Sequence, residues 1–234
     1  MNDVVLLSEI NPRGWMVPPL VQAKDWFGLL TDDEFAELDT QTEPVFERVI
    51  NLIYERCAEA GKHLVIRDWS HLDFLALPFL DTQTNRLSLI NSLQHSFTAN
   101  QICLVRHPMD QYQSIIRLQI WQRYGESELN LLLRSMKLFA ERAAKIGFIR
   151  YEEFVVDHEK ELSSACKSLG IPFDRNYRMS WSDYDTITGN VSGSRGGTSQ
   201  IQVLPRRHMP KVQIDYLQSS FDYQNICGIL GYEP

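Results

Sequence analysis

The stretch QICLVRHPMDQYQSIIR, residues 101–117, is the part of the sequence that decides the fold. It opens with the apolar run Ile102–Val105, which is typical of a buried strand. Pro108 suits the first turn of a helix, because its missing N–H would have no partner there. Asp110 adds a negative charge where the helix dipole favours one. The sequence therefore predicts a strand that ends near Arg106 and a helix that starts directly after it.

This junction between strand and helix has the features of an anion site. Arg106 stands at the carboxyl end of the predicted strand, beside free N–H groups and the positive end of a helix dipole. Ser114 lies seven residues after His107, two helical turns on and on the same face, so its hydroxyl could join the site. The alternative from these residues alone is an arginine that only pairs with a nearby carboxylate, and both interpretations stay open.

In the order strand, R-x-P-x-D-x-x-x-S, helix, Arg106 and Ser114 resemble the 3′-phosphate-binding motif of the sulfotransferase family. Members of that family take their sulfuryl group from 3′-phosphoadenylyl sulfate (PAPS). The resemblance implies PAPS as co-substrate, no metal, and a donor 3′-phosphate held by Arg106 and Ser114. Further stretches follow in the family's order.

The segment RDWSHL, residues 67–72, comes after a predicted strand and is similar to the family's K-x-H segment, which carries the general base. A histidine with a pKa near neutrality can take a proton from an alcohol. The resemblance thus makes His71 the candidate catalytic base. The lysine is not matched and the spacing is longer, so His71 could instead cap a helix or lie in a loop. Asp68 could orient His71 or pair with Arg67.

Two later stretches are also similar to the family. Residues 149–174, IRYEEFVVDHEKELSSACKSLGIPFD, match its pattern R-Y-E-D/E-L/F, loop, helix and L-G-I/L, and Asp157 is placed there as a helix N-cap. The run SRGG, residues 194–197, resembles the family's loop over the 3′-phosphate and adenine, which implies binding roles for Arg195 and Gly196. A flexible surface loop is the alternative for this run.

Strands alternate with helices along the chain, which predicts a mainly parallel sheet with helices on both faces. The predicted strands are Asp3–Leu7 (followed by a turn from Ser8), His63–Ile66, Ile102–Val105 and Gly147–Tyr151. The predicted helices, besides the one after Arg106, are Pro44–Ala60, Thr84–Phe97, Glu126–Ile146 and Val212–Leu230. With the resemblance, this indicates a three-layer α/β/α sulfotransferase fold of the P-loop NTPase-like type, in one domain over residues 1–234.

The composition narrows the possible classes of protein. The 234 residues are 44% hydrophobic and 23% charged, which is ordinary for a globular protein. A net charge of −7 argues against nucleic-acid binding, so an anion site must be a local basic pocket. Arg206-Arg207-His208 is a dense basic cluster that could guide an anionic donor or simply be solvated. The four cysteines lack metal-ligand spacing. Without a membrane-length apolar segment or a signal peptide, we expect a cytoplasmic protein.

The sequence departs from the family in one respect. Sulfotransferases begin with a strand, a phosphate loop P-[KR]-[ST]-G-[ST]-[ST] and a helix, and no such run occurs in these residues. We therefore expect the fold without its first strand–loop–helix unit, and weak or no turnover, because the loop holds the transferring group. The chain could be part of a longer enzyme or a relative that binds without catalysis, or residues 189–197 could replace the loop.

The leading hypothesis is a sulfotransferase that acts from PAPS on a hydroxyl or amine of a small molecule or carbohydrate. The alternative is a non-catalytic nucleotide-binding or interaction protein on the same scaffold. A phosphate-ester enzyme is a third hypothesis, but the sequence shows no metal-ligand cluster for it. No motif indicates the identity of the acceptor or the oligomeric state.

Overall fold

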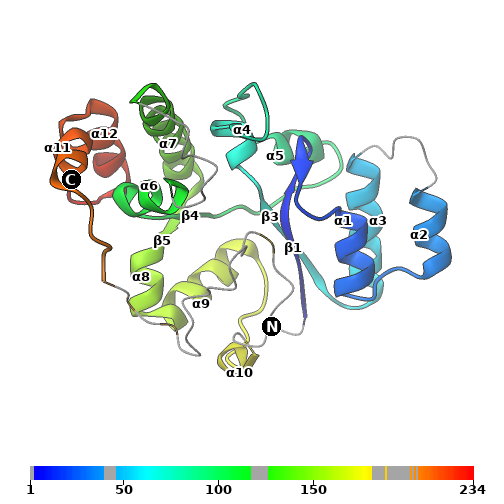
Figure 1. The fold of residues 1–234 in the computed structure, drawn as a ribbon. Coiled ribbons are helices and arrows are strands. Elements are labelled where there is room, and N and C mark those ends of the chain that lie inside the picture. The colour runs from blue at the N-terminus through cyan, green and yellow to red at the C-terminus, as the bar shows by residue number, and fades with distance from the viewer. Residues whose placement is uncertain are drawn as a thin grey trace. The chain divides into compact units, whose positions relative to one another are not determined.

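The computed structural model describes residues 3–39, 46–116, 126–180, 188, 201, 203 and 205–234. The chain divides into two compact units, each with a small sheet that contains one parallel pair of strands (Figure 1). The first unit comprises Met1–Asp73, Arg86–Ala99 and Asp174–Gln200, and the second comprises Phe74–Asn85, Asn100–Phe173 and Ile201–Pro234. The expectation of a single domain stays a prediction.

The sheet of the first unit has the order β2-β1-β3. β1 (Val4–Asn11) pairs in parallel with β3 (His63–Asp68) and antiparallel with the short β2 (Gly14–Trp15). The prediction that β1 would turn from Ser8 onward is wrong, because the strand continues to Asn11. It does so through an irregularity between Ser8 and Ile10, where Glu9 has a φ of +54°. A bulge of this kind lets pairing resume beyond an unpaired residue.

One face of β1 forms the core of the first unit with α3 (Phe46–Glu59). The buried residues of the two elements are Val5, Leu7 and Ile10 from β1, and Val49, Ile50, Ile53 and Cys57 from α3. In β1 the spacing is two from Val5 to Leu7 and three across the irregularity to Ile10, and in α3 Val49 or Ile50, Ile53 and Cys57 recur every three or four residues, as burial of one face requires. This confirms the predicted helix, although residues 40–45, which include its predicted start, lie outside the described part of the chain.

Short elements complete this part of the structure. They are α1 (Pro19–Val21), the π-helix η1 (Gln22–Trp26), α2 (Asp32–Asp39), α4 (His71–Phe74), α5 (Ser88–Leu93) and α10 (Tyr177–Ser180). α5 is shorter than the helix predicted over Thr84–Phe97. Its first N–H, that of Ser88, donates to the carboxylate of Asp73 at 2.9 Å, so a residue distant in sequence sets where the helix begins.

The second unit contains the strand and helix that the opening motif predicts. β4 (Cys103–Val105) pairs in parallel with β5 (Phe148–Arg150), and α6 (Pro108–Ile116) begins at the proline. α7 has the predicted bounds, Glu126–Ile146. β5 is shorter than predicted, because Tyr151 already starts α8 (Tyr151–Val156).

Two C-terminal helices pack with α7 in the core of the second unit. They are α11 (Lys211–Ser219) and α12 (Phe221–Leu230), where the sequence predicted one helix. Ser220 separates them with an extended backbone, and its hydroxyl accepts the N–H of Tyr223 at 3.5 Å as an N-cap. The shared core of the three helices includes Leu133, Ala140, Ala143, Leu217, Tyr223, Ile226 and Cys227.

Taken together, the mixed α/β class and the parallel strand pairs are confirmed. The three-layer arrangement and the missing first unit of the fold stay predictions. Among the described helices, none is long and apolar enough to cross a membrane.

The predicted cap of α9 (His158–Leu169) is confirmed and supplies a test of local stability. The Asp157 carboxylate accepts the N–H of Lys160 at 3.2 Å. Asp157→Ala is expected to lower the free energy of unfolding by about 1 kcal/mol, because it leaves that N–H without its cap. Asp157→Asn removes the same charge but keeps a capping oxygen, and urea unfolding should place it close to wild type. Equal losses for both variants would show that charge, rather than capping, matters here.

Candidate functional site

A pocket of about 240 Å³ lies in the second unit, where β4 meets α6. Its lining residues are Arg106, Asp110, Gln113, Tyr151, Glu152, Val155, Val203, Pro205, Arg206 and Arg207. Three arginines therefore face two carboxylates, which makes the pocket locally basic in a chain of net charge −7. Pockets for whole ligands usually measure about 300–1,000 Å³. The size suits part of a nucleotide, such as a phosphorylated ribose.

Arg106 is the central cation of this pocket. Its side chain is exposed, and its guanidinium carbon lies 5.1 Å from the centroid of the Tyr151 ring. Among the described residues, no carboxylate lies within ion-pair distance of it, so the interpretation of Arg106 as a mere salt-bridge partner finds no support there. Stacking on a ring uses the face of the guanidinium and leaves its N–H edge able to donate to an anion.

At the start of α6, the N–H groups of His107 and Met109 are already used. The His107 N–H donates to Glu152 at 2.9 Å, Pro108 has no N–H, and the Met109 N–H donates to His107 Nδ1 at 3.3 Å. Binding of an anion at this junction therefore depends on the guanidinium groups more than on the helix backbone.

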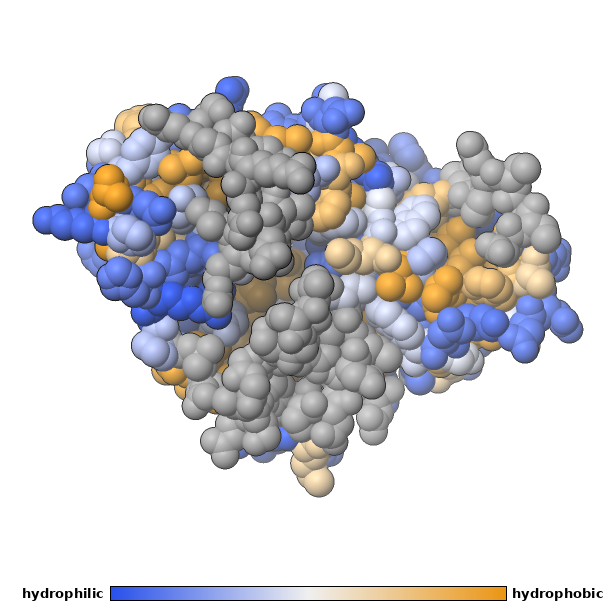
Figure 2. Space-filling view, viewed as in Figure 1, coloured by the Kyte–Doolittle hydropathy of each residue, from blue (hydrophilic) through white to orange (hydrophobic). Residues whose placement is uncertain are grey.

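The basic cluster of the sequence lies against α6. Arg206 Nε donates to Asp110 Oδ2 at 3.3 Å, and Gln113 Nε2 donates to the carbonyl of Arg207 at 3.2 Å. Figure 2 shows a largely hydrophilic surface over α8 and the segment that leads to α11. The sequence showed that this cluster is basic, but Arg206 and Arg207 are so far from Arg106 in the chain that no sequence pattern indicated their proximity.

The other residues predicted to bind the donor are Ser114, Arg195 and Gly196. Ser114 is half-buried on α6, four residues after Asp110 and so on the same helix face, but Asp110 and Gln113 are the α6 residues that line the pocket. Arg195 and Gly196 lie outside the described residues. Their binding roles stay predictions.

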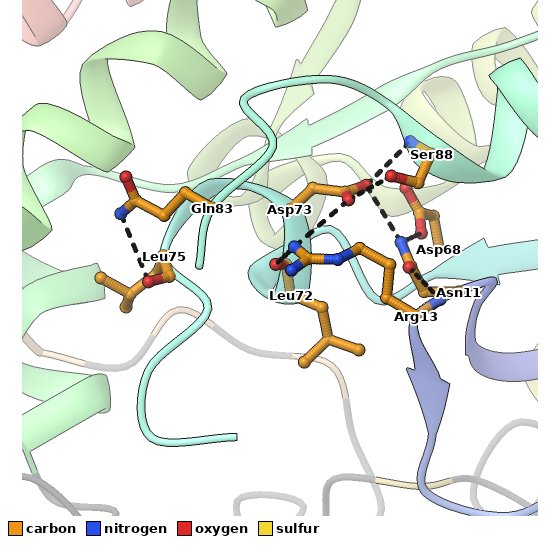
Figure 3. A network of polar contacts seen from close by, with 8 residues as sticks. All are labelled: Asn11, Arg13, Asp68, Leu72, Asp73, Leu75, Gln83 and Ser88. Atoms are coloured by element: carbon orange, nitrogen blue, oxygen red, sulfur yellow. Dashed lines mark hydrogen bonds and ion pairs between the residues drawn. The ribbon is translucent and has the colours of Figure 1, made fainter. Parts of the chain in front are cut away.

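A second group of polar side chains lies in the first unit, at the carboxyl ends of β1 and β3 (Figure 3). The Asn11 amide nitrogen donates to Asp68 Oδ1 and to Asp73 Oδ2, each at 3.0 Å. Asp73 is fully buried and also accepts from the hydroxyl of Ser88 at 2.5 Å. Arg13 lies 3.9 Å from Asp73 and donates to the carbonyl of Leu72. The carboxyl ends of parallel strands are where open α/β sheets bind their ligands.

Asp68 is a buried carboxyl group with a raised pKa. Burial raises its pKa to about 7, the Asn11 hydrogen bond opposes this, and the charge of Asp73 adds to it. Asp68 does not pair with Arg67, which instead forms an ion pair with Glu9 at 3.0 Å. A carboxyl that titrates near neutral pH can exchange protons with a substrate, and such groups concentrate at functional sites.

The candidate base His71 lies between the two aspartates in sequence. It is half-buried and is the first residue of α4, three residues after Asp68. It thus belongs to the first unit, whereas Arg106 and Ser114 belong to the second. The described residues contain no group of three or more His, Cys, Asp or Glu side chains that could hold a metal.

Comparison with known proteins identifies the fold. No protein-family model and no curated protein matches the sequence. Among solved structures, the sulfotransferase domain from the curacin biosynthetic pathway is similar, with a TM-score of 0.56 and 17% identity over 97% of this chain and 82% of that one. The chain therefore has a sulfotransferase-like fold, and at this level of identity the likeness concerns the fold alone.

The raised pKa of Asp68 predicts that this residue destabilises the protein at neutral and alkaline pH. Its folded pKa, about 7, exceeds the value near 4 of an unfolded aspartate, so the stability that its neutral form contributes is fully present below about pH 4 and is lost as the pH rises to about 7 and above. Asp68→Asn keeps an oxygen for Asn11 and cannot ionise. The free energy of unfolding at pH 8 should rise by about 1–4 kcal/mol.

Unfolding measured from pH 4 to pH 8 checks this prediction. The gain should shrink toward pH 4, where wild-type Asp68 is neutral as well. Asp33→Asn alters an exposed aspartate of α2 and is the matched control, with no comparable pH-dependent gain. An Asp68→Asn protein no more stable than wild type at pH 8 would contradict the prediction.

Proposed function

We propose that this chain binds PAPS and transfers its sulfuryl group to a hydroxyl or amine of a small-molecule or carbohydrate acceptor. The observation that carries the proposal is the environment of the Arg106 guanidinium. It lies in a pocket with two further arginines, stacks on Tyr151 and has no carboxylate partner among the described residues. The sulfotransferase-like fold supports the choice of PAPS over other anionic ligands.

In this proposal the 3′-phosphate of the donor binds in the basic pocket. The N–H edge of Arg106 donates to two phosphate oxygens, a geometry in which a guanidinium is strongest. Arg207, in the segment before α11 that also lines the pocket, adds positive charge. Ser114 adds its hydroxyl, and Arg195 and Gly196 cover the phosphate and the adenine, as the resemblance to the family implies.

His71 is the proposed general base. It takes the proton of the acceptor hydroxyl while the acceptor oxygen bonds to sulfur, and the bond from sulfur to the bridging oxygen breaks in line. Adenosine 3′,5′-bisphosphate (PAP) leaves with the bonding electrons. Such a transfer depends on positioning and charge stabilisation more than on covalent help from the protein.

One observation favours the alternative, a protein that binds the nucleotide without catalysis. The 234 residues contain no lysine or arginine followed by S/T-G-S/T, the core of the loop that holds the transferring group in sulfotransferases. The basic pocket does not need that loop, because its lining comes from β4–α6, α8 and the segment before α11. Binding of PAP without sulfuryl transfer would therefore identify this second function.

Calorimetric titration with PAP, with ADP as the reference, tests donor binding. Wild type should bind PAP more tightly than ADP, and Arg106→Ala should weaken PAP binding about 10- to 100-fold while ADP binding stays the same, because only PAP carries the 3′-phosphate. Arg142→Ala removes an exposed arginine of α7 as a control and should bind like wild type. Equal affinities for PAP and ADP in wild type would refute the proposal.

The role of His71 is tested by transfer of radiolabelled sulfate from PAPS to a panel of alcohols. His71→Ala should lower the rate about 100-fold or more with PAP affinity unchanged, because loss of a general base affects the chemical step. His95→Ala, at an exposed histidine of the same unit, should retain the wild-type rate. A wild-type rate in His71→Ala would exclude His71 as the base.

A further inference from the structure

The last residues of the chain return to the Arg106 junction. α12 ends at Leu230, and Gly231 follows with a φ of +70°. This left-handed backbone favours a glycine, and a Cβ at this position would also displace the Arg150 side chain, whose Nη2 would lie 2.6 Å away. The turn directs the next two residues, Tyr232 and Glu233, toward the start of α6. We name Tyr232 and Glu233 the C-terminal latch.

A single carboxylate connects the latch to the junction. The Tyr232 hydroxyl donates to Glu152 Oε2 at 2.7 Å, and the other oxygen, Oε1, accepts the backbone N–H of His107 at 2.9 Å. Burial, followed by this hydrogen bond, raises the pKa of Tyr232, so the phenol stays a donor. A carboxylate in the lining of an anion pocket opposes anion binding, but here both of its oxygens are engaged by donors.

The latch makes a second contact with the same residue. Nε2 of His107 lies 3.1 Å from the carbonyl oxygen of Glu233. Since Nδ1 accepts the N–H of Met109, Nε2 carries the proton and donates to that carbonyl. The His107 ring also packs edge-on against the Tyr232 ring, with their centroids 5.0 Å apart. His107 is thus held through its backbone and its ring.

The geometry points to a function for these contacts. We propose that Tyr232, acting through Glu152, is a positioning residue that fixes the Arg106 junction in its anion-binding conformation. β4 ends at Val105, so no strand pairing holds Arg106. Glu152 directly follows Tyr151, the residue on which Arg106 stacks, and His107 directly follows Arg106, so the bond between Glu152 and His107 ties together the two chain segments that carry the stacked pair. Preorganisation of this kind raises affinity without a new contact to the ligand.

The inference rests on the proposed function, and the test separates the two. Tyr232→Phe keeps the ring and removes only the hydroxyl. Tyr216→Phe is the matched control. It also removes a tyrosine hydroxyl, one that donates to Asn130 Oδ1 at 3.1 Å, but neither Tyr216 nor Asn130 lines the pocket. We expect Tyr232→Phe to weaken PAP binding about 3- to 10-fold in calorimetry, with ADP binding unchanged and Tyr216→Phe like wild type.

The outcomes that overturn the inference are distinct. Wild-type PAP affinity in Tyr232→Phe refutes it, and so does an equal loss for PAP and ADP, which would indicate a general structural effect. Amide hydrogen exchange at His107 tests the latch without nucleotide: it should be faster in Tyr232→Phe, and an unchanged rate refutes the latch. A wild-type chain that prefers neither nucleotide refutes the proposed function, and with it this inference.

Discussion

The stacking of the Arg106 guanidinium on the Tyr151 ring is the contact on which the basic pocket depends. A salt bridge would have used the N–H edge of the arginine and cancelled its charge, whereas the ring uses only its face. The neighbouring Glu152 then orders the backbone at His107 and accepts from Tyr232. In this way a carboxylate that would otherwise repel an anion serves to hold the cation in place.

The first unit contains a buried cluster of polar side chains of a different kind. The carboxyls of Asp68 and Asp73 share one amide donor, that of Asn11, and burial raises the pKa of Asp68 to about 7. Keeping such a group at the end of β3 costs stability at alkaline pH. His71, the proposed general base, lies three residues after Asp68 at the start of α4.

The sequence predicted correctly those helix starts that are set by residues close to them in the chain. The proline at the start of α6 and the cap at Asp157 are read from neighbouring residues, and both are confirmed. The features that the sequence did not predict are an unusual backbone conformation and contacts between residues far apart in the chain. β1 continues past Glu9, which has a positive φ, a strained conformation that a glutamate rarely adopts. α5 begins where the carboxylate of Asp73 meets Ser88, and the bond from Tyr232 to Glu152 spans 80 residues, so neither has a local pattern.

The most direct test of the central claim is a crystal structure of this chain with PAP bound. We expect the 3′-phosphate to lie within hydrogen-bond distance of the Arg106 guanidinium, with that guanidinium still stacked on Tyr151. A 3′-phosphate that faces solvent, or a nucleotide bound away from the pocket between β4 and α6, would contradict it.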